Sequence, residues 1–224
     1  MIPAVRLFTK EAHEISASDR EIWRYLGYGN SAPDETMLRE IEEVRLLFGQ
    51  AVQYRACYAK TRIGRTAQGE TVFPFGTVKS VALERNLAGC EEAWVFCATA
   101  GIAVDRMIAR NAVIRTSRSV IMDAVATAAL EAFCDALCDS FGQKELQRPR
   151  FSPGYGDLSV EYQEEVLRYL DARRKINVQL TEAGMMVPSK SVTAVAGIGK
   201  EACAMASGCR TCGQKDCAYR RKEA

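Results

Sequence analysis

An arginine placed just before a tight turn and a tyrosine is the stretch of this 224-residue sequence best suited to chemistry. Arg150 opens the run R-F-S-P-G-Y, which ends at Tyr155. A guanidinium presents a planar fork of donors that can hold both oxygens of a carboxylate. Pro153 presets its own φ, Gly154 permits a close backbone approach, and the tyrosine supplies a flat ring with a polar tip. The alternative is that Arg150 only pairs with a nearby acid and that the turn is architectural.

A cluster of cysteines near the end of the chain is the second group that could do chemistry. Its spacing is C-x5-C-x2-C-x4-C, formed by Cys203, Cys209, Cys212 and Cys217. A C-x2-C pair brings two thiolates within reach of one metal, and two more could complete a tetrahedral zinc site or hold an iron–sulfur cluster. Neighbouring lysines and arginines would favour the thiolates. The spacings match neither a common zinc ribbon nor the usual ferredoxin run, so a disordered reduced tail or a redox-labile disulfide stays open.

Helices and short strands must position these groups. A capping box, Ser18-x-x-Glu21, predicts a short helix to residue 26, and helical spacing of apolar residues predicts a second over residues 34–53. Further helices are predicted over residues 102–115, 120–138 and 159–174. Strands are predicted over residues 52–63, 93–99, 175–180 and 191–198, and in T-V-F-P-F-G and T-V-K-S-V-A-L, with Pro74 at an edge or bulge. The pattern lacks a regular βαβ alternation, which favours an α+β fold with a mainly antiparallel sheet.

Composition sets the limits of the interpretation. The chain is 48% hydrophobic, which is ample for one core, and its net charge is +2 from 30 basic and 28 acidic residues. We therefore expect no general attraction to nucleic acid or to a membrane. No apolar run approaches the ~20 residues needed to cross a bilayer, and the first ten residues lack the apolar core of a signal peptide. The sequence predicts a cytoplasmic protein with one domain over residues 1–199 and a Cys-rich extension over residues 200–224.

The five earlier cysteines are expected to be small core residues in the reduced state rather than ligands. They are Cys57, Cys90, Cys97, Cys134 and Cys138.

Two segments together resemble a known family. R-x-x-x-G-Y at Arg150, a following amphipathic helix, and L-T-E-A-G-M-M-V-P-S-K-S-V from Leu180 are similar to the activation domain of cobalamin-dependent methionine synthase. The whole chain resembles the short, free-standing form of that domain, and the close match covers about residues 150–197. The fold of the family, a curved antiparallel sheet with helices packed around it, agrees with the α+β prediction.

The resemblance also implies a site for S-adenosylmethionine. Arg150 matches the arginine that holds the ligand carboxylate, and the backbone around Ser152 and Gly154 would line the pocket. Tyr155 matches the tyrosine of the motif. Glu145 could balance the ammonium or the sulfonium, although the family's acid falls one residue differently. Glu182 lies in the matched L-T-E segment, where it faces either the ligand or the structure. The larger members complete their site with a late tyrosine-containing segment, and this chain runs into its cysteines there.

An accessory role in methyl transfer follows from the resemblance. The family rescues cob(II)alamin on methionine synthase, using an electron from a flavodoxin or ferredoxin and a methyl group from S-adenosylmethionine. A free-standing chain would act on a separate cobalamin-binding methionine synthase subunit, as an accessory component of the methyltransferase class. The protein would supply positioning in a site with little water, and no general base is needed. Two alternatives stay open: a redox or iron–sulfur protein delivering electrons to a corrinoid protein, and a non-catalytic module that only docks to one.

Overall fold

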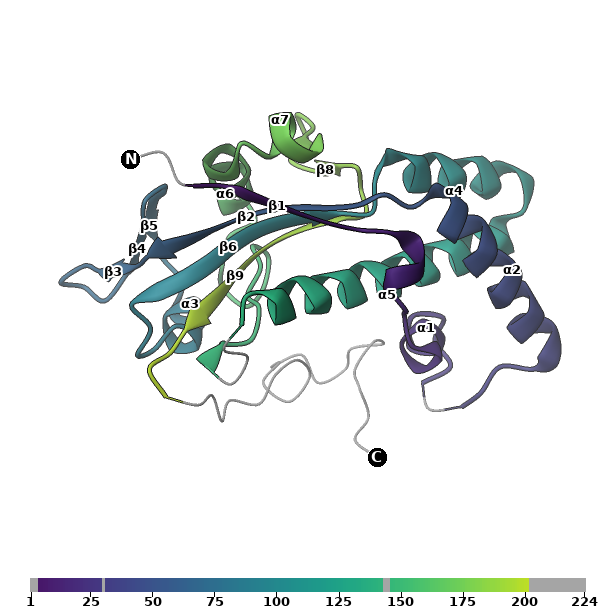
Figure 1. The fold of residues 1–224 in the computed structure, drawn as a ribbon, viewed down its shortest axis with the longest axis horizontal. Helices are drawn as coiled ribbons and strands as arrows, with labels where there is room; N and C mark the ends of the chain where they lie inside the picture. The colour runs from purple at the N-terminus through teal and green to yellow at the C-terminus, as the bar shows by residue number, and fades with distance from the viewer. Residues whose placement is uncertain (1–3, 30, 143–145, 202–224) are drawn as a thin grey trace.

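A four-stranded antiparallel sheet forms the centre of the protein (Figure 1). The computed structural model describes residues 4–29, 31–142 and 146–201. The strands lie in the order β1-β2-β6-β9, with β1 spanning Arg6–Lys10, β2 Tyr54–Arg62, β6 Glu92–Thr99 and β9 Ser191–Ile198. Helices cover both faces, so the predicted α+β fold with an antiparallel sheet is confirmed.

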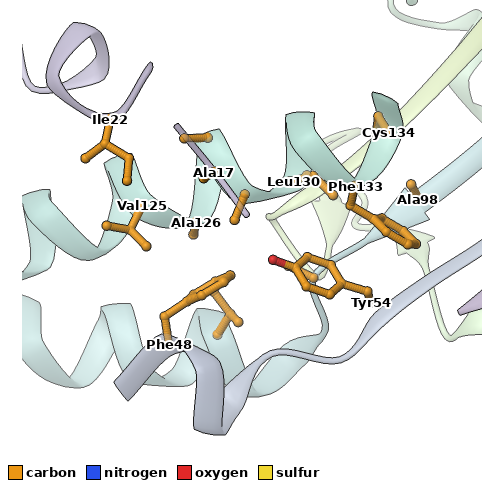
Figure 2. Packing of buried hydrophobic residues seen from close by; sticks show 14 of the residues in the cluster. Ala17, Ile22, Phe48, Tyr54, Ala98, Val125, Ala126, Leu130, Phe133 and Cys134 are labelled. Carbon is orange, nitrogen blue, oxygen red and sulfur yellow. The ribbon is translucent and has the colours of Figure 1, made fainter. Parts of the chain in front are cut away.

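One face of the sheet carries the longest helix. Helix α5 (Thr116–Ser140) runs beneath the strands in Figure 1, with α1 (Asp19–Tyr25), α2 (Glu35–Ala51) and α4 (Ile102–Ile114) packed around it. Figure 2 shows the core between them, where Phe133 of α5 lies against Tyr54 of β2 with ring centroids 4.9 Å apart. Ser18 caps α1 by accepting from the Glu21 amide, which confirms the predicted helix start.

The opposite face carries the second core. Side chains alternate between the faces of a strand, so Ala56 points to the α5 side and Cys57 to the other. There α3 (Val81–Asn86), α6 (Tyr162–Leu170) and α7 (Ala172–Ile176) supply the covering apolar residues. The smaller elements are the 3-10 turn Ala12–Glu14, a sheet of β3 (Gly64–Arg65), β4 (Thr71–Phe73) and β5 (Gly76–Val78), and a hairpin of β7 (Gln179–Leu180) and β8 (Met186–Val187).

Three predicted elements differ in the structure. The helix expected over residues 159–174 is two helices, because Asp171 adopts a left-handed φ of 51° that an α-helix cannot continue through. The strand expected over residues 175–180 shrinks to its last two residues, since α7 continues to Ile176 and Asn177 has φ 58°.

The segment T-V-K-S-V-A-L is the third difference. It leaves strand β5 and enters helix α3, because the Ser80 hydroxyl accepts from the Leu83 amide and caps a helix there. Pro74 lies in the turn between β4 and β5.

None of the helices in the described residues combines the length and the apolar character needed to cross a bilayer.

Candidate functional site

The segment that carries Arg150 lies along the outer edge of the sheet. Phe151 exchanges two backbone hydrogen bonds with Val195 of β9, each 2.9 Å long, and the Arg148 amide donates to the Gly197 carbonyl at 2.8 Å. This pairing fixes the backbone on both sides of Arg150. The R-F-S-P-G-Y run is therefore held like an extra edge strand before it turns away.

Arg150 reaches helix α5. Its Nη2 lies 2.9 Å from Glu131 Oε2 and 2.9 Å from Asp135 Oδ1. The two acids are four residues apart and so lie on one face of the helix. Arg150 Nη1 is buried and has no hydrogen-bond partner within the described structure. Nη2 thus ties the guanidinium to α5, whereas Nη1 keeps its donors without an acceptor in the described structure.

The electrostatics keep this arginine charged. Burial alone would lower the pKa of the Arg150 guanidinium, but Cys134, Glu131 and Asp135 beside it raise the pKa above its usual value. The Arg150 side chain is 24% exposed, whereas the Asp135 side chain is 71% exposed. One guanidinium and two carboxylates give the group a formal charge of −1. Asp135 is the partner that can most easily move into solvent.

The charge of Glu131 acts on two tyrosines. Tyr155 is 53% exposed and its ring meets that of Phe151 edge-on at 6.0 Å. Burial raises the pKa of Tyr155, and the charge of Glu131 raises it further. Burial and Glu131 also raise the pKa of Tyr25, at the end of α1, against the opposing effect of Arg24. A single carboxylate is therefore close enough to influence both hydroxyl groups.

The turn after Arg150 also has structural duties. The Ser152 carbonyl accepts from the Tyr155 amide at 3.0 Å, and the Gly154 amide donates to Leu158 at 2.8 Å. Gly154 has φ +92°, a conformation that favours glycine. Asp157 accepts hydrogen bonds from the Ser80 hydroxyl and from the first amides of α3. Both parts of the alternative stated for this segment are therefore observed: Arg150 pairs with acids, and the turn braces a helix.

The segment L-T-E-A-G-M-M-V-P-S-K-S-V, which begins at Leu180, also contacts helix α5. Lys190 lies 2.7 Å from Asp123 and 3.0 Å from Thr127, which are about two turns and one turn before Glu131 on α5. Asp105 of α4 accepts from the Ser189 amide and hydroxyl at 2.5 and 3.0 Å, which holds the loop before β9. Both segments therefore contact the same stripe of α5, which runs through Asp123, Thr127, Glu131 and Asp135.

Glu182 lies apart from this group. It occupies the exposed turn of the β7–β8 hairpin, and within the described residues no hydrogen bond or ion pair joins it to Arg150. The acids that do meet Arg150 were not among the predicted site residues. Their spacing of four on a predicted helix was visible in the sequence, but nothing there showed that the helix crosses beneath the arginine.

Five predicted site residues lie outside the described residues. They are Glu145, Cys203, Cys209, Cys212 and Cys217. Among the described residues, no group of three or more histidine, cysteine, aspartate or glutamate side chains is arranged to hold a metal. The five earlier cysteines form no disulfide in the described part of the chain; Cys138 is partly exposed and the other four are buried, as predicted for core residues.

Comparison with known proteins supports the fold assignment. No family model and no curated protein matches the sequence. Among solved structures, the chain has the fold of a reactivation domain. One matching structure is the crystal structure of the MetH reactivation domain bound to AdoHcy, with a TM-score of 0.66 over 91% of this chain and 81% of that one. The two sequences are 12% identical, so the likeness establishes a shared fold.

Proposed function

We propose that this protein binds S-adenosylmethionine at Arg150 and helps to reactivate a cobalamin-dependent methionine synthase. The observation that carries the proposal is the Arg150 guanidinium, which is charged, largely buried and bonded through Nη2 while Nη1 has no partner in the described structure. Support comes from the fold, which is similar to that of a reactivation domain solved with AdoHcy, a close analogue of this ligand.

The ligand carboxylate would take the place of Asp135 at the guanidinium. An ion pair as exposed as that of Asp135 contributes only about 0–1 kcal/mol, so exchanging it for a ligand carboxylate costs little. A bidentate arginine–carboxylate pair is stronger and directional. The unused Nη1 donors then gain an acceptor once the ligand and the side chain adjust to each other.

Glu131 would receive the positive part of the ligand. With Asp135 displaced, Arg150 and Glu131 together are neutral, and the ligand adds a carboxylate, an ammonium and a sulfonium. An arginine beside a carboxylate suits the zwitterionic amino-acid end, since the ligand carboxylate meets Arg150 and the ligand ammonium meets Glu131. Tyr155, whose pKa responds to both charges, would cover part of the ligand, while the backbone of Ser152 and Gly154 would form the wall.

The role proposed for the protein is positioning. Bound S-adenosylmethionine would be presented to cobalamin held by a separate methionine synthase subunit, with a flavodoxin or ferredoxin as electron donor, in the cytoplasm. The sulfonium methyl leaves with a neutral thioether behind it, so no side chain has to move a proton. What the chain must do is hold the methyl group in line and exclude water.

The direct test is calorimetric titration of the purified protein with S-adenosylmethionine. We expect saturable one-to-one binding in the native protein and a loss of about 2 kcal/mol or more in Arg150→Ala. Arg168→Ala is a matched control, since Arg168 also pairs with two acids of a helix, Glu164 and Glu165, but on the exposed surface of α6. Equal affinity in the native protein and Arg150→Ala would refute the assigned site.

The Cys-rich extension stays a separate prediction. Metal or cluster binding by Cys203, Cys209, Cys212 and Cys217 concerns residues outside the described structure. Ultraviolet–visible absorption and metal analysis of anaerobically purified protein test it. Stoichiometric metal that is lost when Cys209 and Cys212 are both replaced by serine would support the site, and stoichiometric metal retained in that variant would rule it out.

A further inference from the structure

The middle of helix α5 is buried except along one polar stripe. Its buried positions between residues 121 and 137 are all apolar or cysteine, and Figure 2 shows Val125, Leu130 and Phe133 among the core side chains. The positions in this range that are not buried are 123, 127, 131, 132, 135 and 136. Four of them form the stripe of Asp123, Thr127, Glu131 and Asp135, and the other two are alanines. The part of the helix that a ligand can reach is therefore polar.

A cation contacts each end of the stripe. Arg150 pairs with Glu131 and Asp135, and Lys190 pairs with Asp123 at 2.7 Å. At 1.5 Å per residue, Asp123 and Glu131 are about 12 Å apart along the helix. The stripe thus holds two acids at a set separation, each beside its own cation.

Asp123 presents a fixed acceptor that is not used. Lys190 Nζ contacts Asp123 Oδ1 and lies 3.0 Å from Thr127 Oγ1, whereas no hydrogen bond or ion pair within the described residues involves Asp123 Oδ2. The Lys190 side chain is 16% exposed and that of Asp123 is 55% exposed. Removing the carboxylate from a largely buried ammonium is costly, so Lys190 keeps Asp123 in place. More than half of the Asp123 side chain stays open to solvent.

We infer that Asp123 accepts hydrogen bonds from the ribose hydroxyls of the ligand and makes the site specific for ribonucleosides. This inference rests on the proposed function, which places the amino-acid end of S-adenosylmethionine at Arg150 and Glu131. Several bonds separate the ribose from that end, so an extended ligand needs a second polar contact farther along the protein. The stripe continues from Glu131 to Asp123 as the open part of the helix, and the separation of about 12 Å suits an extended chain.

A carboxylate paired with a lysine suits a sugar. Each ribose hydroxyl can donate one hydrogen bond, and an ionised carboxylate has only acceptors. Acidic side chains recognise ribose hydroxyls by the same chemistry in dinucleotide-binding folds. Lys190 meets no charged group of the ligand in this arrangement, so the Lys190–Asp123 pair stays neutral overall. An uncharged donor such as a hydroxyl therefore fits there better than a second cationic group.

Deoxy analogues of S-adenosylhomocysteine test the contact. Calorimetry would compare the parent compound with its 2′-deoxy and 3′-deoxy analogues in each protein. In the native protein we expect at least one analogue to bind about tenfold more weakly than the parent, because a hydrogen bond to a charged group is lost. In Asp123→Asn, which leaves Lys190 an acceptor, that ratio should fall at least about threefold. Glu92→Gln is the matched control, since Glu92 pairs with Lys60 at the same 2.7 Å, and it should keep the native ratio.

The possible results separate the two hypotheses. Native protein that does not bind S-adenosylhomocysteine would overturn the proposed function and, with it, this inference. Native protein that binds the parent and both analogues equally would overturn the inference alone, and so would a ratio in Asp123→Asn equal to the native ratio. The ratio of two affinities in one sample does not depend on the fraction of folded protein, so partial unfolding of the variant leaves the test valid.

Discussion

Arg150 Nη2 lies 2.9 Å from Glu131 Oε2, which joins the sheet edge to helix α5 through a residue nineteen positions earlier in the chain. The contact gives Nη2 of the largely buried guanidinium a carboxylate partner. Nη1 is buried and has no hydrogen-bond partner in the described structure. The structure also distinguishes the two acids that meet Arg150, because the Glu131 side chain is 43% exposed and that of Asp135 is 71% exposed. In the proposed site Glu131 faces the ligand ammonium, whereas Asp135 is displaced by the ligand carboxylate.

Replacing the two acids in turn should therefore have different effects on ligand affinity. Glu131→Gln removes the charge that faces the ligand ammonium, and we expect S-adenosylmethionine binding to weaken by about 1 kcal/mol, a value reduced for partial exposure. Asp135→Asn removes the group that competes with the ligand carboxylate, so affinity should stay equal or rise. Calorimetry on both variants checks the prediction. Stronger loss in Asp135→Asn than in Glu131→Gln would reverse the roles assigned here.

Gly156 should be required for docking the turn onto helix α3. It has φ +55°, and a Cβ added there would lie 2.9 Å from the Ala82 Cβ. We expect Gly156→Ala to lower the free energy of unfolding by about 1–3 kcal/mol through backbone strain and overpacking. Gly49→Ala is the control, because Gly49 lies within α2 with open space around it and should gain about 0.5–1 kcal/mol. Urea denaturation of both variants measures the difference, and equal stability would contradict the packing described.

Stability should fall in alkaline solution because several thiols are buried. Burial raises the pKa of Cys57 to about 12 and raises the pKa values of Cys97 and Cys134 as well. Unfolded thiols lose their protons near pH 8.5, so ionisation above that pH favours the unfolded state and stability is complete only below it. At pH 9.5 each such thiol should cost about 1.4 kcal/mol relative to neutral pH.

Urea denaturation at pH 7.5 and pH 9.5 tests this dependence. The Cys97→Ala variant should lose less stability between the two pH values than the native protein does. An identical loss in both proteins would mean that Cys97 does not titrate in this way.

The sequence predicted the sheet and its main helices well, for identifiable reasons. Strands β6 and β9 are apolar runs bounded by turn residues, and α2 shows a clear helical period with an acid at its start. Elements that depend on one backbone angle were missed. Asp171, where the helix breaks, and Asn177 both have φ above 50°. No local sequence pattern predicted these backbone angles.

Only the residues of the candidate site that are close together in the chain could be predicted from the sequence. Arg150 and Tyr155 stand together in the chain, so their spacing was visible. Glu131 and Asp135 reach Arg150 through the tertiary packing of α5, and distances of that kind cannot be read from spacing. Glu182 was matched by its segment, yet that segment contacts α5 through Lys190, at Asp123 and Thr127.

The central claim is that Arg150 anchors the carboxylate of S-adenosylmethionine, and one titration tests it most directly. Native protein, Arg150→Ala and Arg168→Ala would be titrated with S-adenosylmethionine under identical conditions. We expect one-to-one binding in the native protein and in Arg168→Ala, and affinity weaker by about 2 kcal/mol or more in Arg150→Ala. Unchanged affinity in Arg150→Ala, or no binding by the native protein either alone or with its cobalamin-carrying partner, would contradict the claim.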